Sequence, residues 1–318
     1  MKGAKFLVNA VVAATMIIGG AWLGCKSDST TEPSSSTPSV QAPTNLRAYS
    51  AGPTSVGLLW ALSSSESDTI LNGYLVVTKD PSGTVVGSNN IAKGTPNTTV
   101  TSLTEGVIYT FVVRATGGGG IVSGDSVSVR WSPARRYSND STLSIPIQVY
   151  ELRSTLGASG LQFNSNGLYA KVRSLNASNP DRFLCDIYVD SIGGGAVCLK
   201  NIGLLTGYPR VTYFSSEPLR DVTDLNDPRT APPDTNSYQL NRKDLPSGAV
   251  NQSVVLYAKT ANSGVSNYVR ILVQRNPATG FLYSGSGSDR YVVLQLSYQN
   301  TPGNWFATPI QASVTPQR

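Results

Sequence analysis

The chain has 318 residues, only 14% of them charged, and its formal net charge is +6 at pH 7. It contains no histidine, and its two methionines, Met1 and Met16, both precede residue 25. Because the chain after residue 24 has neither His nor Met, it cannot carry out Ser-His-Asp or Cys-His catalysis, bind zinc through His or ligate haem through His or Met. Its positive charges are scattered rather than arranged in a basic stripe, so no nucleic-acid partner is expected.

Residues 1–24 have the pattern of a secretory signal, with Lys2 and Lys5 before an apolar run that ends just ahead of Cys25. A cysteine at this place resembles the lipidation site of bacterial lipoproteins, although Trp22 stands where that family usually has leucine. The resemblance implies that Cys25 carries lipid, becomes the new N-terminus and anchors the chain to a membrane. The alternatives are an uncleaved membrane anchor and ordinary secretion.

Residues 25–41 continue as a segment rich in Ser, Thr and Pro, which cannot build a core and is expected to act as a flexible tether. Removal of Lys2 and Lys5 with the signal lowers the net charge from +6 to +4.

Residues 42–137 carry short strand patterns separated by turn residues, which is typical of a β-sandwich. The expected strands are 55–60, 72–78, 97–103, 107–115 and 126–131.

This segment resembles a fibronectin type III domain. The matching residues are Pro43 and Leu46 at its start, Trp60, Tyr74, and the series Leu103, Tyr109, Phe111, Val113 and Ala115. The resemblance implies a sandwich in which Trp60 and Tyr109 are core residues, with the Tyr109 hydroxyl reaching upstream backbone. It also implies a spacer or binding scaffold rather than a catalytic unit.

After a polar joint at 138–142, residues 143–309 are expected to form a second all-β domain, an antiparallel β-sandwich or jelly-roll, followed by a tail at 310–318. Its expected strands are 145–152, 160–164, 168–172, 183–189, 196–199, 210–214, 254–260, 267–274 and 289–298.

The rhythm of the strand patterns at 255–273 and 289–298 resembles the C-terminal β-domains of haem-scavenging lipoproteins. The His or Met ligands that haem capture needs are absent here, so the resemblance implies a fold and not haem binding.

Cys185 and Cys198 remain as an even pair once Cys25 is lipidated, and outside the cytoplasm we expect them to form a disulfide. A hairpin turn at Ser191 and Ile192 places them opposite each other, whereas a turn centred on the following glycines separates them. The alternative is two small buried side chains.

An acidic loop follows at 221–234, and its oxygen ligands are of the kind that calcium prefers. The candidate calcium ligands are Asp221, Asp224, Asn226, Asp227 and Asp234. The alternative is a solvated acidic loop partly neutralised by Arg220 and Arg229, and no other cofactor is expected.

Aromatic side chains in loops can stack on sugar rings or grip peptides, so they are the candidate ligand-binding residues. They are Tyr208, Phe281, Tyr283, Trp305 and Phe306.

These features together predict a lipid-anchored, non-enzymatic binding or structural protein of the outer membrane, facing either the surface or the periplasm. Its partner is expected to be a glycan or another envelope protein. One alternative is a carbohydrate-active enzyme or accessory subunit, which requires two carboxylates facing across a cleft. The acids available for that role are Glu151, Asp186, Glu217 and Asp221. The other alternative is a nutrient-capture lipoprotein, which requires a deep apolar pocket.

Overall fold

The computed structural model describes residues 39–140, 145–192, 195–227 and 235–306. The signal, Cys25, the tether up to residue 38 and the tail at 310–318 lie outside these ranges. Within them, every regular element is a β-strand or a short 3₁₀ helix, which confirms the expected all-β fold. No helix in the described ranges is long and apolar enough to cross a membrane.

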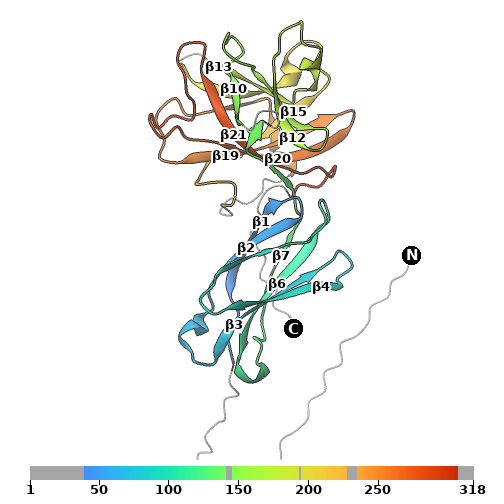
Figure 1. Cartoon of the computed structure of the whole chain (residues 1–318), viewed down its shortest axis with the longest axis vertical. Helices are drawn as coiled ribbons and strands as arrows, with labels where there is room; N and C mark the ends of the chain where they lie inside the picture. The colour runs from blue at the N-terminus through green and yellow to red at the C-terminus, as the bar shows by residue number, and fades with distance from the viewer. Residues whose placement is uncertain (1–38, 141–144, 193–194, 228–234, 307–318) are drawn as a thin grey trace, which may run out of the picture. The chain divides into compact units, whose positions relative to one another are not determined.

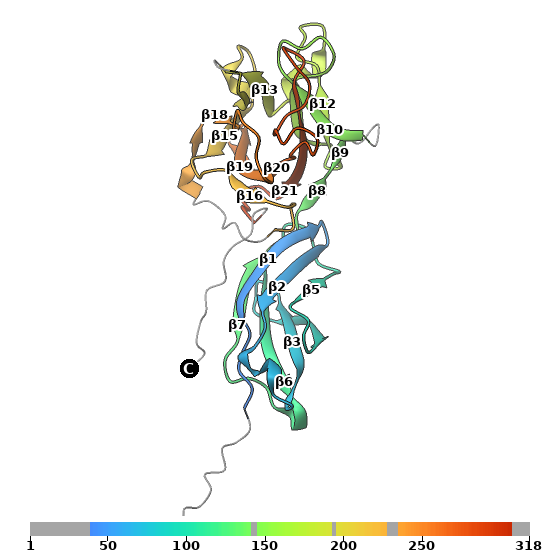
Figure 2. The same cartoon turned by 90° about the vertical axis from the view of Figure 1, so that its left-hand side faces the viewer.

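The first domain is a sandwich of two antiparallel sheets that pack face to face (Figure 1, Figure 2). The three-stranded sheet has the order β1 (Thr44–Gly52), β2 (Ser55–Ala61) and β5 (Asn97–Val100). The four-stranded sheet has the order β4 (Val85–Ala92), β3 (Leu71–Lys79), β6 (Tyr109–Gly117) and β7 (Val127–Trp131).

Alternation of side chains explains why this sandwich closes on one core. Along β6 every second residue is buried, because successive side chains of a strand point to opposite faces of the sheet. Trp60 and Tyr74 come from opposite sheets, and their rings meet edge to face at 5.6 Å. The expectation that Trp60 is a core residue is therefore confirmed, since only 5% of it is exposed.

Tyr109 forms the corner that its spacing from Leu103 predicts. Its ring is buried, and its hydroxyl accepts a hydrogen bond from the backbone N–H of Thr104 at 3.1 Å. The corner fixes the loop before β6 against the core and leaves Tyr109 unavailable as a ligand-binding residue.

The second domain is built on one fourteen-stranded, mostly antiparallel sheet. The order begins β17 (Tyr238–Leu240), β15 (Val211–Ser215), β19 (Ser253–Asn262), β20 (Val265–Val273), β21 (Tyr291–Tyr298) and β10 (Ile145–Tyr150). It continues β9 (Asn139–Asp140), β12 (Tyr169–Arg173), β11 (Gly160–Ser165), β13 (Ile187–Ser191), β14 (Val197–Asn201) and β18 (Arg242–Asp244). β16 (Arg220–Val222) pairs with β19, and β8 (Arg135–Tyr137) pairs with β21.

The sheet bends around one main apolar core, because strands from both of its halves contribute to the same cluster, and two smaller clusters lie apart from it. Phe163 of β11 and Leu199 of β14 are buried together with Phe214 of β15 and Ile271 of β20. The connecting 3₁₀ helices of the chain are η1 (Ser64–Ser67), η2 (Gly118–Gly120), η3 (Pro180–Leu184), η4 (Ile202–Leu204) and η5 (Thr235–Ser237).

The segment after β21 returns to the first domain. The Gln299 amide donates to Ser132 Oγ at 3.3 Å and to the Pro133 carbonyl at 3.2 Å. The Asn304 amide donates to the Gly106 carbonyl at 2.9 Å and to Ser132 Oγ at 3.1 Å. The second domain is thus connected to the first by the chain at β8 and also by this returning segment.

Candidate functional site

The acidic loop after β16 is held by arginines of the protein itself. Arg270 is 1% exposed and donates to the Leu225 carbonyl at 2.8 Å and to the Asp227 carbonyl at 2.7 Å. Arg136 donates to the Asn226 side-chain oxygen, while Asp224 Oδ1 accepts the Asn226 N–H at 2.6 Å. Two of the candidate ligand oxygens, Asn226 Oδ1 and Asp224 Oδ1, therefore already accept hydrogen bonds within the protein.

Among the described residues, no three carboxylate, thiol or imidazole groups lie close enough together to hold a metal ion. Asp234, one of the five expected calcium ligands, lies outside the described residues.

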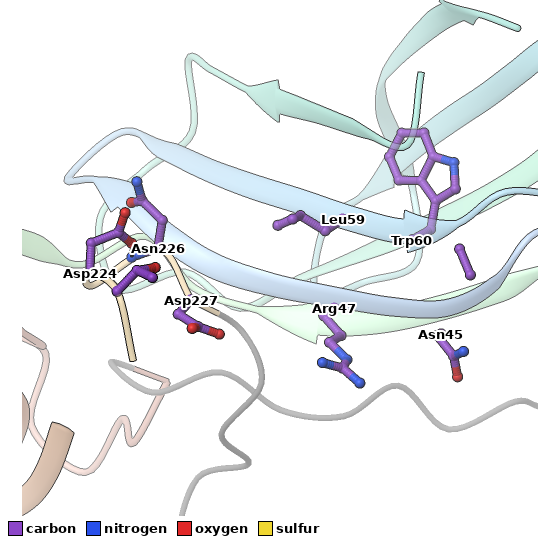
Figure 3. A pocket seen from close by; sticks show the side chains of 9 residues that line it. Asn45, Arg47, Leu59, Trp60, Asp224, Asn226 and Asp227 are labelled. Carbon is purple, nitrogen blue, oxygen red and sulfur yellow. Dashed lines mark hydrogen bonds between the residues drawn. The ribbon is translucent and has the colours of Figure 1, made fainter. Parts of the chain in front are cut away.

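A cavity of about 540 Å³ lies between this loop and the strands β1 and β2 (Figure 3). Arg47 projects from the strands toward the cavity. The Trp60 indole projects from the opposite face of the strands, into the sandwich core. Asp224 and Asp227 border the cavity from the loop.

The four acids considered for glycoside hydrolysis do not form a pair across a cavity. Glu151 is buried and lies 2.5 Å from Arg290 Nε, and Asp186 is buried and accepts a hydrogen bond from Arg210 at 2.9 Å. Glu217 is exposed and lies 3.6 Å from Arg220. Four cavities are lined by described residues, and none of them is lined by Glu151, Asp186, Glu217 or Asp221.

The five candidate aromatics lie in three separate places. Phe306 is 4% exposed, and its ring packs edge to face on Trp131 at 5.8 Å, inside the sandwich core of the first domain. Trp305 stacks on Phe306 at 4.6 Å and is half-buried. Phe306 therefore serves the core and does not face solvent.

Phe281 and Tyr283 stack at 5.1 Å in the loop before β21, and the Arg290 guanidinium lies 5.3 Å from the Tyr283 ring. Tyr208 contacts Phe183 at 5.2 Å in another loop pair. These three candidate rings are half-buried, so each keeps part of its surface for a ligand.

A groove of about 500 Å³ lies between the loop at 152–159 and the loop at 174–176. Its lining includes the polar side chains of Ser154, Thr155, Ser159, Ser174 and Asn176. The remaining lining residues are Leu152, Leu156, Gly157, Ala158 and Leu175, so no charged side chain lines it.

Hydrogen bonds hold the 152–159 loop in a fixed shape. Asp289 Oδ1 accepts from Ser154 Oγ at 2.8 Å and from the Thr155 N–H at 3.2 Å. Gly157 lies directly against the Tyr150 ring, where a Cβ atom would approach to 2.1 Å. Tyr150 in turn packs on Tyr291 at 4.9 Å. The half-buried rings of Tyr150 and Tyr291 therefore support the 152–159 loop and preorganise the wall of the groove.

None of these groove residues was among the candidate site residues expected from the sequence. Short Ser, Thr and Asn side chains are common in ordinary surface loops, so their composition alone marks no site. The available signal was the pair of loops rich in small residues at 153–159 and 174–179, one after the expected strand 145–152 and one after the expected strand 168–172.

The expected disulfide between Cys185 and Cys198 is wrong, because both residues are free thiols. In the hairpin of β13 and β14, Cys198 lies opposite Asp190, and Ser191 lies opposite Val197. The strand pairing thus continues to Ser191, which excludes a turn at Ser191 and Ile192, and Cys185 lies outside the paired strands, just after η3. The register of β13 with β14 therefore keeps Cys185 and Cys198 from lying opposite each other.

We expect native protein comprising residues 26–318 to react very slowly with thiol reagents. Burial raises the pKa of Cys185 to about 12 and that of Cys198 to about 11, so both stay protonated at neutral pH. Denaturation without a reductant should expose two reactive thiols per chain, as counted with Ellman's reagent. Thiols that appear only after reduction would contradict the assignment.

Residues 41–123 match the family model of the fibronectin type III domain. The chain contains a fibronectin type III domain. Its seven strands and the tyrosine corner fit that assignment, which confirms the resemblance seen in the sequence. The match covers the first domain alone and assigns no family to the second.

Three solved structures illustrate what parts of this chain are similar to. A myokine structure has 18% identity over 30% of this chain and 99% of its own, with a TM-score of 0.26. The FN5 domain of Drosophila Lar has 19% identity over 30% and 97%, with a TM-score of 0.23. The Clostridium perfringens spore cortex lytic enzyme SleM has 18% identity over 29% and 28%, with a TM-score of 0.24. The search of curated proteins gave no match.

Proposed function

We propose that this chain is a lipid-anchored, non-enzymatic binding protein of the cell envelope. In this proposal, Cys25 attaches it to the outer membrane, the fibronectin type III domain acts as a spacer and the second domain recognises the ligand. The observation that carries the recognition role is the preorganised groove between the loops at 152–159 and 174–176.

The chemistry of the groove favours a neutral, hydroxyl-rich ligand. Its Ser and Thr hydroxyls and the Asn176 amide can each donate and accept hydrogen bonds, as a sugar hydroxyl requires. Leu156 and Leu175 supply apolar surface for the faces of sugar rings. Because no charged side chain lines the groove, a neutral glycan fits better than an ionic ligand.

The positions of the acids favour binding over hydrolysis. A glycosidase needs a carboxyl pair about 5–5.5 Å or about 6.5–9.5 Å apart across its cleft. Glu151 and Asp186 instead form ion pairs with Arg290 and Arg210. A nutrient-capture role is less favoured, since the second domain fills its interior with side chains and its described groove is polar.

The test is a glycan and peptidoglycan array probed with residues 26–318, produced without the signal and the lipid. We expect binding to neutral oligosaccharides. A Leu156→Arg variant should abolish it, because Leu156 lines the groove, is 72% exposed and contributes little to folding.

Leu168→Arg is the matched control, since Leu168 is 66% exposed in the second domain but lies outside the groove. Equal loss of binding in both variants, or no binding on any array, would contradict recognition at this groove. Turnover of a bound glycan would contradict the non-enzymatic assignment.

A further inference from the structure

The outer edge of β4 is left open. β4 forms one edge of the four-stranded sheet, and within the described ranges it pairs with β3 alone (Figure 1). Seven of its eight residues are exposed, including Val85 at 56% and Val86 at 54%. An edge strand presents unpaired backbone N–H and C=O groups, which form a template for another strand.

The composition of β4 does not protect this edge. Its residues are Val85, Val86, Gly87, Ser88, Asn89, Asn90, Ile91 and Ala92, with no charge and no proline. Charged side chains and proline are the usual means by which proteins prevent strands from pairing at an edge. The register with β3 is interrupted only between Gly87 and Val85, so residues 87–92 form a regular strand.

Other edges of the same protein are protected. The two ends of the large sheet are β17 and β18, each three residues long, and all three residues of β18 are charged. β5 has four residues, and β7, the opposite edge of the four-stranded sheet, has five and carries the exposed Arg130. β1 carries Arg47 and two irregularities in register. The contrast singles out β4 as a strand suited to intermolecular pairing.

We propose that β4 pairs antiparallel with β4 of a second copy of this chain, about a two-fold axis at Asn89. The two four-stranded sheets then join into one continuous sheet. This interface belongs to the first domain and is independent of the groove proposed for ligand recognition.

The two-fold symmetry of a dimer limits the registers in which two β4 strands can pair. A two-fold axis perpendicular to the sheet keeps each face on its own side, so residues that oppose each other must share a face. Because faces alternate along a strand, the axis must pass through a residue rather than between two residues. Axes at Asn89 and at Asn90 both pair residues of the regular part of the strand, whereas an axis at Ser88 shifts the pairing toward the interrupted end. The order of side chains decides between the first two.

The order of side chains in β4 is complementary to itself at this register. Gly87 lies opposite Ile91 and Ser88 opposite Asn90, so a small residue meets an apolar one and a polar residue meets a polar one. No like charges oppose each other, because the strand carries none. These features favour a second copy over a partner with a charged strand.

Sedimentation equilibrium of residues 26–318 tests the proposal. We expect the mass to rise with concentration toward twice that of the single chain. Asn89→Lys places two lysines directly opposite each other at the axis and should weaken dimerisation by about tenfold or more. Gln239→Lys, an exposed change on the edge strand β17, is the matched control and should leave dimerisation unchanged.

An Asn89→Cys variant tests the register. Opposed residues of an antiparallel pair have Cα atoms about 4.5–5.5 Å apart. That separation suits a disulfide, so mild oxidation should give a covalent dimer on a non-reducing gel, and Gln239→Cys should not. A monomer at every concentration would overturn the proposal. A dimer insensitive to Asn89→Lys and not cross-linked by Asn89→Cys would also overturn it.

Discussion

Replacing Phe306 by alanine is expected to lower the free energy of unfolding of the fibronectin type III domain by about 3–5 kcal/mol. Phe306 is 4% exposed and packs on Trp131, although about 175 residues separate the two along the chain. Its removal would leave a cavity at the end of the sandwich. Ser50 stabilises the same place, since its hydroxyl accepts from Trp131 Nε1 at 2.9 Å and donates to the Ser132 carbonyl at 2.9 Å.

Urea unfolding of residues 26–318, followed by tryptophan fluorescence, measures this change because Trp131 lies against the substituted ring. Leu156→Ala is the control, since that leucine is 72% exposed and should change stability by no more than about 0.5 kcal/mol. Equal midpoints for the two variants would show that the returning segment does not contribute to the core of the first domain.

Replacing Asp186 by alanine is expected to destabilise the second domain by about 3–5 kcal/mol. The carboxylate is 1% exposed and accepts from three donors: the Phe163 N–H at 2.7 Å, the Thr260 hydroxyl at 2.7 Å and Arg210 at 2.9 Å. Its loss would leave a partly buried arginine and two buried donors unsatisfied. Asp186→Asn keeps acceptor capacity and should cost less than alanine.

Thermal unfolding of residues 26–318 checks this order, with Asp221→Ala as the control because Asp221 is exposed. Equal unfolding temperatures for the Asp186→Ala and Asp221→Ala variants would contradict the structural role of Asp186. The same series separates a structural acid from a catalytic one, since a catalytic acid would alter turnover with little change in stability.

The first domain was predictable because its signals are local. The Leu103–Tyr109 spacing predicts the corner, and the alternation at 109–115 predicts the buried face of β6. Two of the seven strands of the first domain, β1 (Thr44–Gly52) and β4 (Val85–Ala92), were nevertheless not among the expected strands. In the second domain the longer strands were found. The short strands β8, β9, β16, β17 and β18 were not found, because two or three residues cannot show a period of two.

The candidate site depended on features that no local pattern contains. The loops at 152–159 and 174–176 are ordinary polar loops until the sheet brings them to the same groove. Phe306 looked like an exposed loop aromatic, since nothing near it in sequence shows that it packs on Trp131.

The sequence by itself determined the β-strand content and the core of the fibronectin type III domain, because alternation and corner spacing are properties of neighbouring residues. Only the tertiary structure decided the register that separates Cys185 from Cys198 and the arginine contacts of the acidic loop. It also decided the return of Phe306 to the first domain. Each depends on contacts between residues distant in the chain, whose free energy is set by packing and burial and not by local preference.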